Sequence, residues 1–222
     1  MKNLLKDVDT IIFDNDGTLF QADLISFPAV VSAYKDLMKI HQVKLTIPSK
    51  NEINSHIGLP AKEYFKNLLP VELQKWSDQF EQMCVQHEIF NIQKGLGSLY
   101  DGVEETLIEL KKRNFRLSVI TNAGVDYFNA VVDYFHYHRF FDAYICLGDR
   151  PHLTKDDLLK EILDHFKTNN GAIVGDKKSD INAGKRHNCL TIAALYGYGT
   201  AEELENADEK IKNFPLLLEL FN

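Results

Sequence analysis

The stretch Thr10-Ile-Ile-Phe-Asp-Asn-Asp-Gly-Thr18 is the segment from which the fold can be predicted. Its run Thr10–Phe13 is apolar on both faces, a pattern typical of a central strand in a parallel sheet. Asp14 then stands at the carboxyl end of that strand, where open α/β sheets bind their ligands. Asp14 and Asp16 could serve as nucleophile and general acid/base. Because Asp, Asn and Gly are common turn formers, a plain polar turn is the alternative interpretation.

Similar apolar runs recur further along the chain and alternate with helical patterns. The runs are Leu117–Ile120, Tyr144–Leu147, Ala172–Val174 and Leu190–Leu195. Between them, apolar side chains repeat at spacings of three and four over residues 103–112, 125–135 and 158–166, which predicts amphipathic helices. Strands that alternate with helices predict an α/β fold with a Rossmann-like, doubly wound parallel sheet.

Residues 22–94 break this alternation. They show helical periodicity but no convincing buried strand. A stretch of about 70 residues is too long for a single crossover, which usually takes a few residues and one helix. We therefore expect a helical subdomain at 22–94, inserted into a catalytic core formed by 1–21 and 95–222. A few extra helices packed beside the sheet are the alternative.

Composition narrows the possible functions. The 222 residues include 25 Lys and Arg against 32 Asp and Glu, for a net charge of −7. An acidic chain without clustered cations is not expected to bind nucleic acid. No apolar run approaches the ~20 residues that span a bilayer, and the first residues lack the pattern of a signal peptide. Together with three scattered cysteines, these features predict a cytoplasmic protein without a membrane partner.

Two further motifs could bind phosphate. Thr121 and Asn122 follow an apolar run, so a hydroxyl and backbone N–H groups could hold phosphate oxygens, although a helix cap has the same appearance. Phosphoryl transfer also needs a cation. We prefer Lys155, which directly precedes an amphipathic pattern, and Arg150, which precedes Pro151, is the rival.

The last motif is a pair of carboxylates, Asp176 and Asp180, after the run that ends at Val174. Their spacing of four places both on one side of a junction between turn and helix. Hard oxygen ligands of this kind suit Mg²⁺. A helix N-terminus with acids in its first turn is the structural alternative.

These motifs, in this order, resemble the four signatures of the haloacid dehalogenase-like hydrolases, a superfamily dominated by phosphatases. The long interval between the first and second motifs resembles the branches with a helical cap after the first motif, which include enzymes similar to phosphoglycolate phosphatase and β-phosphoglucomutase. One departure is that Lys155 is followed by Asp156, where the family commonly has Pro.

The resemblance also implies a role for each site residue. Asp14 would be the nucleophile that forms an aspartyl-phosphate, and Asp16 the general acid and base. Thr121, the Asn122 backbone and Lys155 would hold the phosphoryl group.

The same resemblance implies a Mg²⁺ cofactor. Its ligands would be the Asp14 carboxylate, the Asp16 backbone carbonyl and Asp176, and Asp180 would ligate directly or orient the site. The expected function is therefore a Mg²⁺-dependent phosphatase acting on a small phosphorylated metabolite. The alternatives are a sugar phosphomutase and, less favoured, a non-catalytic binding relative.

Overall fold

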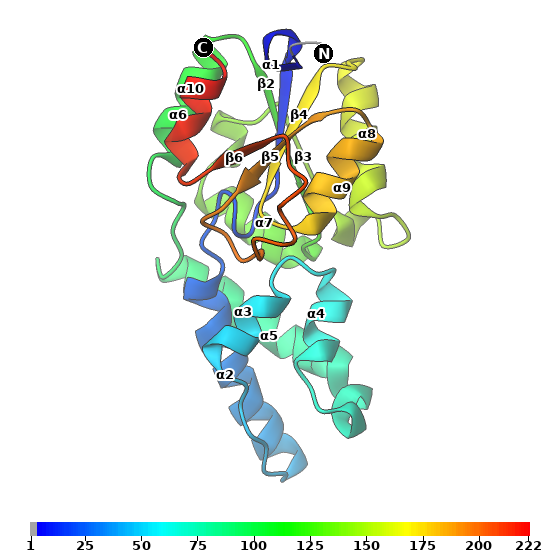
Figure 1. Ribbon diagram of the computed structural model, residues 1–222. Coiled ribbons are helices and arrows are strands. Elements are labelled where there is room, and N and C mark those ends of the chain that lie inside the picture. The colour runs from blue at the N-terminus through cyan, green and yellow to red at the C-terminus, as the bar shows by residue number, and fades with distance from the viewer. Residues whose placement is uncertain (1–3) are drawn as a thin grey trace.

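The strands of this protein form one parallel sheet in the order β3-β2-β1-β4-β5-β6 (Figure 1). The computed structural model describes residues 4–222, so residues 1–3 of the expected core lie outside the described part. The strands are β1 (Thr10–Phe13), β2 (Arg116–Thr121), β3 (Ala143–Cys146), β4 (Gly171–Gly175), β5 (Leu190–Ala194) and β6 (Glu209–Ile211). The predicted α/β fold is confirmed, and β6 is a strand that the sequence analysis did not predict.

Strand β1 lies inside the sheet, between β2 and β4, and pairs with both of them. Phe13 is in register with Val119 of β2 and with Val174 of β4. All four residues of β1 are buried, as expected for a strand covered on both faces. The central position brings the residue after β1, Asp14, between the ends of β2 and β4.

Helices cover both faces of the sheet. They are α6 (Val103–Lys112), α7 (Val125–Tyr134), α8 (Lys155–Phe166), α9 (Lys178–Arg186) and α10 (Leu217–Leu220), with α1 (Leu4–Asp7) before β1 and short 3-10 turns at Tyr137–Arg139, Leu147–Asp149 and Phe214–Leu216. Phe13 packs in the same cluster as Leu107 of α6 and Leu217 of α10, whereas Ile12 packs in a second cluster with Leu159 of α8. Neighbouring residues of a strand thus enter opposite layers.

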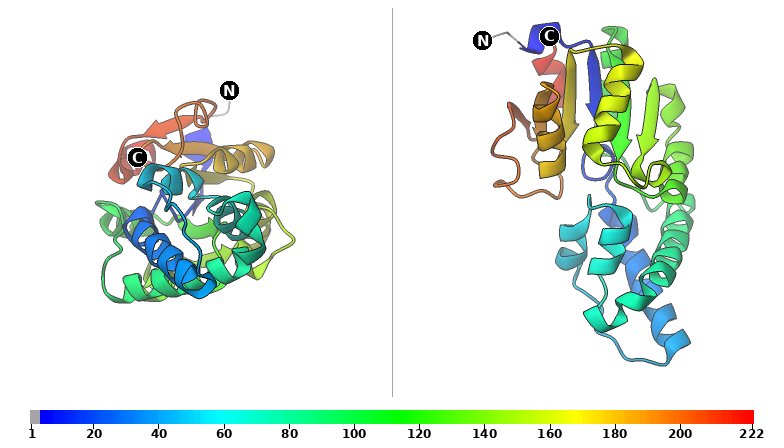
Figure 2. Two further views of the ribbon diagram at one scale, coloured as in Figure 1. Left: turned by 90° about the horizontal axis from the view of Figure 1, so that it is seen from below. Right: turned by 90° about the vertical axis from the view of Figure 1, so that its right-hand side faces the viewer.

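The inserted helices lie beyond the carboxyl ends of the strands (Figure 1, Figure 2). They are α2 (Asp23–His41), α3 (Lys50–His56), α4 (Ala61–Asn67), a 3-10 turn at Val71–Trp76 and α5 (Ser77–Gln93). Tyr34 of α2 meets Phe80 of α5 edge to face, with ring centroids 5.1 Å apart. The predicted helical insert is confirmed, and it faces the edge of the sheet where ligands bind in this class of fold. No helix in residues 4–222 has the length and apolarity needed to cross a membrane.

Candidate active site

Polar side chains gather at the carboxyl ends of three neighbouring strands. Asp14 follows β1, Thr121 is the last residue of β2, and Asp176 follows β4. The backbone N–H of Asp14 donates a hydrogen bond to the Val174 carbonyl at 2.9 Å, which extends the pairing of β1 and β4 into the site. The sheet itself therefore positions these motifs beside one another.

Three buried carboxylates form the centre of the site. One oxygen from each of Asp14, Asp176 and Asp180 lies within 4.8 Å of the others. Asp180 reaches this position from the first turn of α9, and its Oδ2 accepts a hydrogen bond from the Lys177 backbone N–H at 2.9 Å. Asp176 Oδ2 accepts one from the Tyr198 backbone N–H at 2.7 Å. Asp176 and Asp180, which are four positions apart in the sequence, thus form one acidic cluster with Asp14.

Lys155 is the cation that contacts this cluster. It is the first residue of α8 and only 6% exposed. Its Nζ lies 2.5 Å from Asp14 Oδ1 and 2.6 Å from Asp180 Oδ1. Arg150 instead pairs with Glu161 at 2.8 Å. The structure therefore brings Lys155, and not Arg150, to the carboxylates.

Burial controls the protonation of the cluster. It raises the pKa of Asp14 well above its ordinary value, and the charges of Asp180 and Asp176 raise it further, although Lys155 opposes them. Burial and then Asp180 raise the pKa of Asp176 to about 7. Burial alone would lower the pKa of Lys155, but Asp14 and Asp180 outweigh it, and the net pKa is raised. One ammonium thus balances three crowded carboxyl groups only in part.

The donor set of the cluster fits a hard divalent cation. Asp14 Oδ2 is buried and has no hydrogen-bond partner among the described residues. Such an oxygen is costly unless something charged or polar pairs with it. Mg²⁺ takes oxygen ligands and commonly uses only a few protein carboxylates. Asp14, Asp176 and Asp180 therefore form a candidate metal site.

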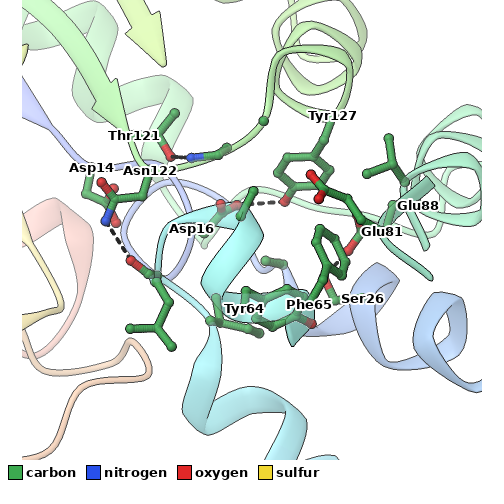
Figure 3. A pocket seen from close by; sticks show the side chains of 18 residues that line it. Asp14, Asp16, Ser26, Tyr64, Phe65, Glu81, Glu88, Thr121, Asn122 and Tyr127 are labelled. Atoms are coloured by element: carbon green, nitrogen blue, oxygen red, sulfur yellow. Dashed lines mark hydrogen bonds between the residues drawn. The ribbon is translucent and has the colours of Figure 1, made fainter. Parts of the chain in front are cut away.

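The Asp16 carboxylate is not part of the cluster formed by Asp14, Asp176 and Asp180. Its Oδ1 accepts hydrogen bonds from the Tyr127 hydroxyl at 2.7 Å and from the Asn15 side-chain amide at 2.8 Å (Figure 3). Burial raises the pKa of Asp16 to about 6, and these two hydrogen bonds oppose the rise.

The turn after Asp16 requires a glycine. Gly17 has a φ of +91°, and a Cβ there would lie 2.4 Å from Asp176 Oδ2.

The two residues at the end of β2 have different partners. The Thr121 hydroxyl oxygen accepts a hydrogen bond from the Ala123 backbone N–H at 3.2 Å. The Asn122 side-chain amide donates to the Gly58 carbonyl at 2.8 Å and so joins the core to the insert. The interpretation from sequence concerned the Asn122 backbone, and the contact of its side chain with the insert is an additional finding.

A pocket lies between the edge of the sheet and the insert (Figure 3). Asp14 and Thr121 line one end of it. Ser26, Tyr64 and Glu88 line the opposite end, which belongs to the inserted helices. Figure 3 shows Asp16 and Tyr127 between these two ends. The pocket thus connects the carboxylates of the core with polar groups of the insert.

Sequence reasoning missed Tyr127 and Glu88. The signal for Glu88 was present, because Phe80, Cys84, Glu88 and Ile92 follow one another at spacings of four and are all buried. A carboxylate on an otherwise apolar helix stripe is unusual, since Glu is almost never fully buried unless it is paired. Tyr127 lies in the first turn of the helix that follows Thr121-Asn122, and nothing in its local sequence marked it.

The chain is similar in sequence and in fold to known proteins. Residues 11–194 match the sequence model of the family described as haloacid dehalogenase-like hydrolase. A phosphoglycolate phosphatase of Vibrio cholerae is 27% identical, with 92% of each chain covered. A pyrophosphatase, PpaX, of Bacillus velezensis is 26% identical, with 90% of this chain and 88% of that protein covered. In fold, a haloacid dehalogenase-like hydrolase from Streptococcus pneumoniae is similar, with a TM-score of 0.81, 22% identity and coverage of 97% and 99%.

Proposed function

The chain belongs to the haloacid dehalogenase-like hydrolases, and from this premise we propose that it is a Mg²⁺-dependent phosphatase acting on a small phosphorylated metabolite. The observation that carries the proposal is the environment of the Asp14 carboxylate. Asp14 lines the pocket, its Oδ2 has no hydrogen-bond partner among the described residues, and its Oδ1 contacts Lys155. A carboxylate held by one oxygen beside a cation, with the other oxygen unpaired, is suited to attack an electrophile.

The proposed reaction proceeds in two steps. An Asp14 oxygen attacks phosphorus while the bond from phosphorus to the ester oxygen breaks, which leaves an aspartyl-phosphate. Asp16 gives its proton to the departing oxygen. It then takes a proton from the water that hydrolyses the aspartyl-phosphate and releases inorganic phosphate. A pKa of about 6 supports both roles, because Asp16 can exchange a proton in either direction near neutral pH.

The next part of the proposal concerns the binding of the phosphoryl group. We assign its binding to the Thr121 hydroxyl, the Asn122 backbone N–H and Lys155. Thr121 and Asn122 line the pocket beside Asp14, and the Lys155 ammonium contacts Asp14 Oδ1. Donors and a cation placed where negative charge develops would stabilise the transition state.

Asp14, Asp176, Asp180 and the backbone carbonyl of Asp16 are the proposed holders of Mg²⁺. When bound, the cation would neutralise charge on the phosphoryl oxygens and on the carboxylates themselves. The three buried carboxyl groups and the unpaired Asp14 Oδ2 support this assignment.

We assign the role of a cap to the insert, with proposed bounds at 22–94. The hydrogen bond from Asn122 to the Gly58 carbonyl supports this role, because it ties the insert directly to a residue of the site. A cap held over the pocket would exclude bulk water and contact the part of the substrate that departs.

The test is hydrolysis of an aryl phosphate in the presence of Mg²⁺. We expect turnover by the unmodified protein, none by Asp14→Asn, and unchanged turnover by Asp164→Asn, a matched change at an exposed carboxylate. Absence of turnover, or turnover that survives Asp14→Asn, would overturn the proposal. Circular dichroism establishes that each variant is folded.

A further inference from the structure

The insert end of the pocket carries polar groups that the proposed hydrolysis does not use. Glu81 and Glu88 come from α5, Ser26 from α2 and Tyr64 from α4, and all four line the pocket. Figure 3 shows them grouped on the side opposite Asp14 and Thr121. A substrate whose phosphate faces Asp14 would therefore direct its leaving group toward these side chains.

Glu88 is held firmly in this end of the pocket. It is 3% exposed, and its Oε1 accepts a hydrogen bond from the Ser26 hydroxyl at 2.8 Å. Burial raises the pKa of Glu88 to about 8 against the effect of that hydrogen bond, and the charges of Asp16 and Glu81 add to the rise. An ionised Glu88 is thus under-compensated by the protein, and a positive charge from a ligand would stabilise it.

Tyr64 supplies a second and independent feature. The residue is only 7% exposed, and its hydroxyl is buried without a hydrogen-bond partner among the described residues. The nearby Ser26 hydroxyl donates its proton to Glu88, so toward Tyr64 it can act only as an acceptor, and the acceptor sites of the Tyr64 oxygen stay free for a donor from a ligand. An unpaired buried hydroxyl is costly, and a ligand that bonds to it would recover that cost. The hydroxyl therefore points to a polar ligand at this end of the pocket.

Cations are missing from the lining of this pocket. Among residues 4–222, no Lys, Arg or His side chain lines it, whereas Asp14, Asp16, Glu81 and Glu88 do. Lys155 is engaged by Asp14 and Asp180. The charge of Lys62 lowers the pKa of Glu81 in part, against burial and Asp78. Lys62 itself is exposed and lines a neighbouring depression instead of this pocket. A carboxylate or second phosphate on the leaving group would meet no counter-charge in this lining, at a high desolvation cost.

We propose that the substrate is the phosphate ester of an amino alcohol, whose ammonium group is received by Glu88 and Glu81. The Tyr64 hydroxyl oxygen accepts a hydrogen bond from the same ammonium. The rings of Phe65 and Tyr64 meet edge to face, with their centroids 4.8 Å apart, and form an aromatic wall of the pocket beside which the ammonium group would lie. This inference rests on the proposed phosphatase activity and specifies the class of its substrate.

The experiment compares esters that differ only at the far end. The probes are 2-aminoethyl phosphate, 2-hydroxyethyl phosphate and carboxymethyl phosphate, with 4-aminobutyl phosphate and its hydroxyl and carboxyl counterparts as longer versions. For at least one chain length we expect kcat/KM to decrease from amine to alcohol to carboxylate, with at least a tenfold preference for amine over carboxylate. A preference for the carboxylate at both lengths, or equal values for all three, would overturn the inference.

Variants locate the source of the preference. In Glu88→Gln and Glu81→Gln the ratio of kcat/KM for amine over carboxylate should fall, by about tenfold for Glu88. Glu63→Gln changes an exposed glutamate beside Tyr64 on α4 and should keep the ratio. Tyr64→Phe should raise KM for the amine more than it lowers kcat. An unchanged ratio in Glu88→Gln would overturn the assignment.

The inference and the proposed function fail in different ways. If the aryl phosphate is hydrolysed but the amine is not preferred, only the inference fails. If no ester is hydrolysed, the proposed function fails, and calorimetry with aminoalkyl and carboxyalkyl phosphonates of equal length tests the pocket without turnover. Tighter binding of the aminoalkyl phosphonate, lost in Glu88→Gln and retained in Glu63→Gln, supports the inference, and equal affinities overturn it.

Discussion

Lys155 and Asp14 form a buried ion pair at the centre of the site, with Nζ 2.5 Å from Oδ1 and 141 positions between them in the chain. The same ammonium lies 2.6 Å from Asp180 Oδ1. One lysine thus compensates two buried carboxylates. This arrangement makes the stability of the fold depend on the groups that we assign to catalysis.

Lys155→Met is expected to destabilise the protein strongly. Removing one partner of a buried pair leaves the other charge uncompensated, which typically costs about 3–5 kcal/mol of unfolding free energy. Urea denaturation at neutral pH, without a divalent cation, measures the loss. Because burial raises the pKa of Asp14 well above its ordinary value, Asp14 can take up a proton, and the loss should be smaller at pH 5.

Arg150→Met is the matched control for that change. Arg150 pairs with Glu161 and not with the carboxylate cluster, so both stability and aryl phosphate turnover should stay near those of the unmodified protein. Loss of turnover in Arg150→Met, with retention in Lys155→Met, would reverse our assignment of the phosphate-binding cation.

Mg²⁺ should stabilise the folded protein. A ligand that binds only the folded state adds about 2.7 kcal/mol at a concentration one hundred times its Kd. Thermal unfolding with increasing Mg²⁺ should therefore show a rising Tm. Asp176→Asn should start from a higher Tm, since one of three crowded carboxylates is neutral, and should gain less from the cation. Asp164→Asn should behave like the unmodified protein, and an equal response of all three would contradict the metal site.

Glu88 should make stability fall as the pH rises. Its folded pKa of about 8 exceeds the ordinary value of 4.5, so the folded state binds more protons than the unfolded state between these values. The contribution is therefore present at low pH and is lost between about pH 4.5 and pH 8. Urea unfolding at pH 5.5 and pH 8 should show a decline that Glu88→Gln reduces by a few kcal/mol. Glu63→Gln should leave the decline unaltered.

Tyr127→Phe should shift the pH dependence of turnover. The Tyr127 hydroxyl donates to Asp16 Oδ1 at 2.7 Å and lowers the pKa of Asp16 from the value that burial alone would produce. Without this hydrogen bond, the pKa of Asp16 rises. In a profile of kcat/KM against pH, the inflection assigned to Asp16 should move to higher pH, and an unmoved inflection would show that Asp16 does not govern it.

Asn122→Ala should loosen the insert. The side-chain amide of Asn122 donates to the Gly58 carbonyl at 2.8 Å across the boundary between core and insert. Loss of one such hydrogen bond costs about 1 kcal/mol. We expect a higher KM for small esters with a modest decrease in stability. Asn129→Ala, at an exposed position of α7, is the control. Equal KM values in the two variants would contradict a role for this bond in holding the insert.

Much of the site follows from local sequence. Asp14, Thr121 and Asp176 each follow or end a short apolar run, and those runs became β1, β2 and β4. The strands of a parallel sheet end at a common edge, and this rule, together with the family resemblance of the ordered motifs, predicted that these residues lie together. Strand β6 could not be predicted in this way, because Glu209–Ile211 is a short edge strand with one buried residue of three.

The contacts among distant residues depended on the tertiary structure. The choice between Lys155 and Arg150 was decided by where α8 begins relative to the sheet. Ser26 and Glu88 are 62 positions apart, and they meet only because α2 packs against α5.

By itself, then, the sequence determined the α/β core, the helical insert and the edge of the sheet where the acids collect, because burial patterns and strand ends are properties of short segments. The pairing of charges and the chemistry of the insert end of the pocket were decided only in three dimensions. Those features arise when helices pack and exclude water, and burial then sets the pKa of each carboxyl group.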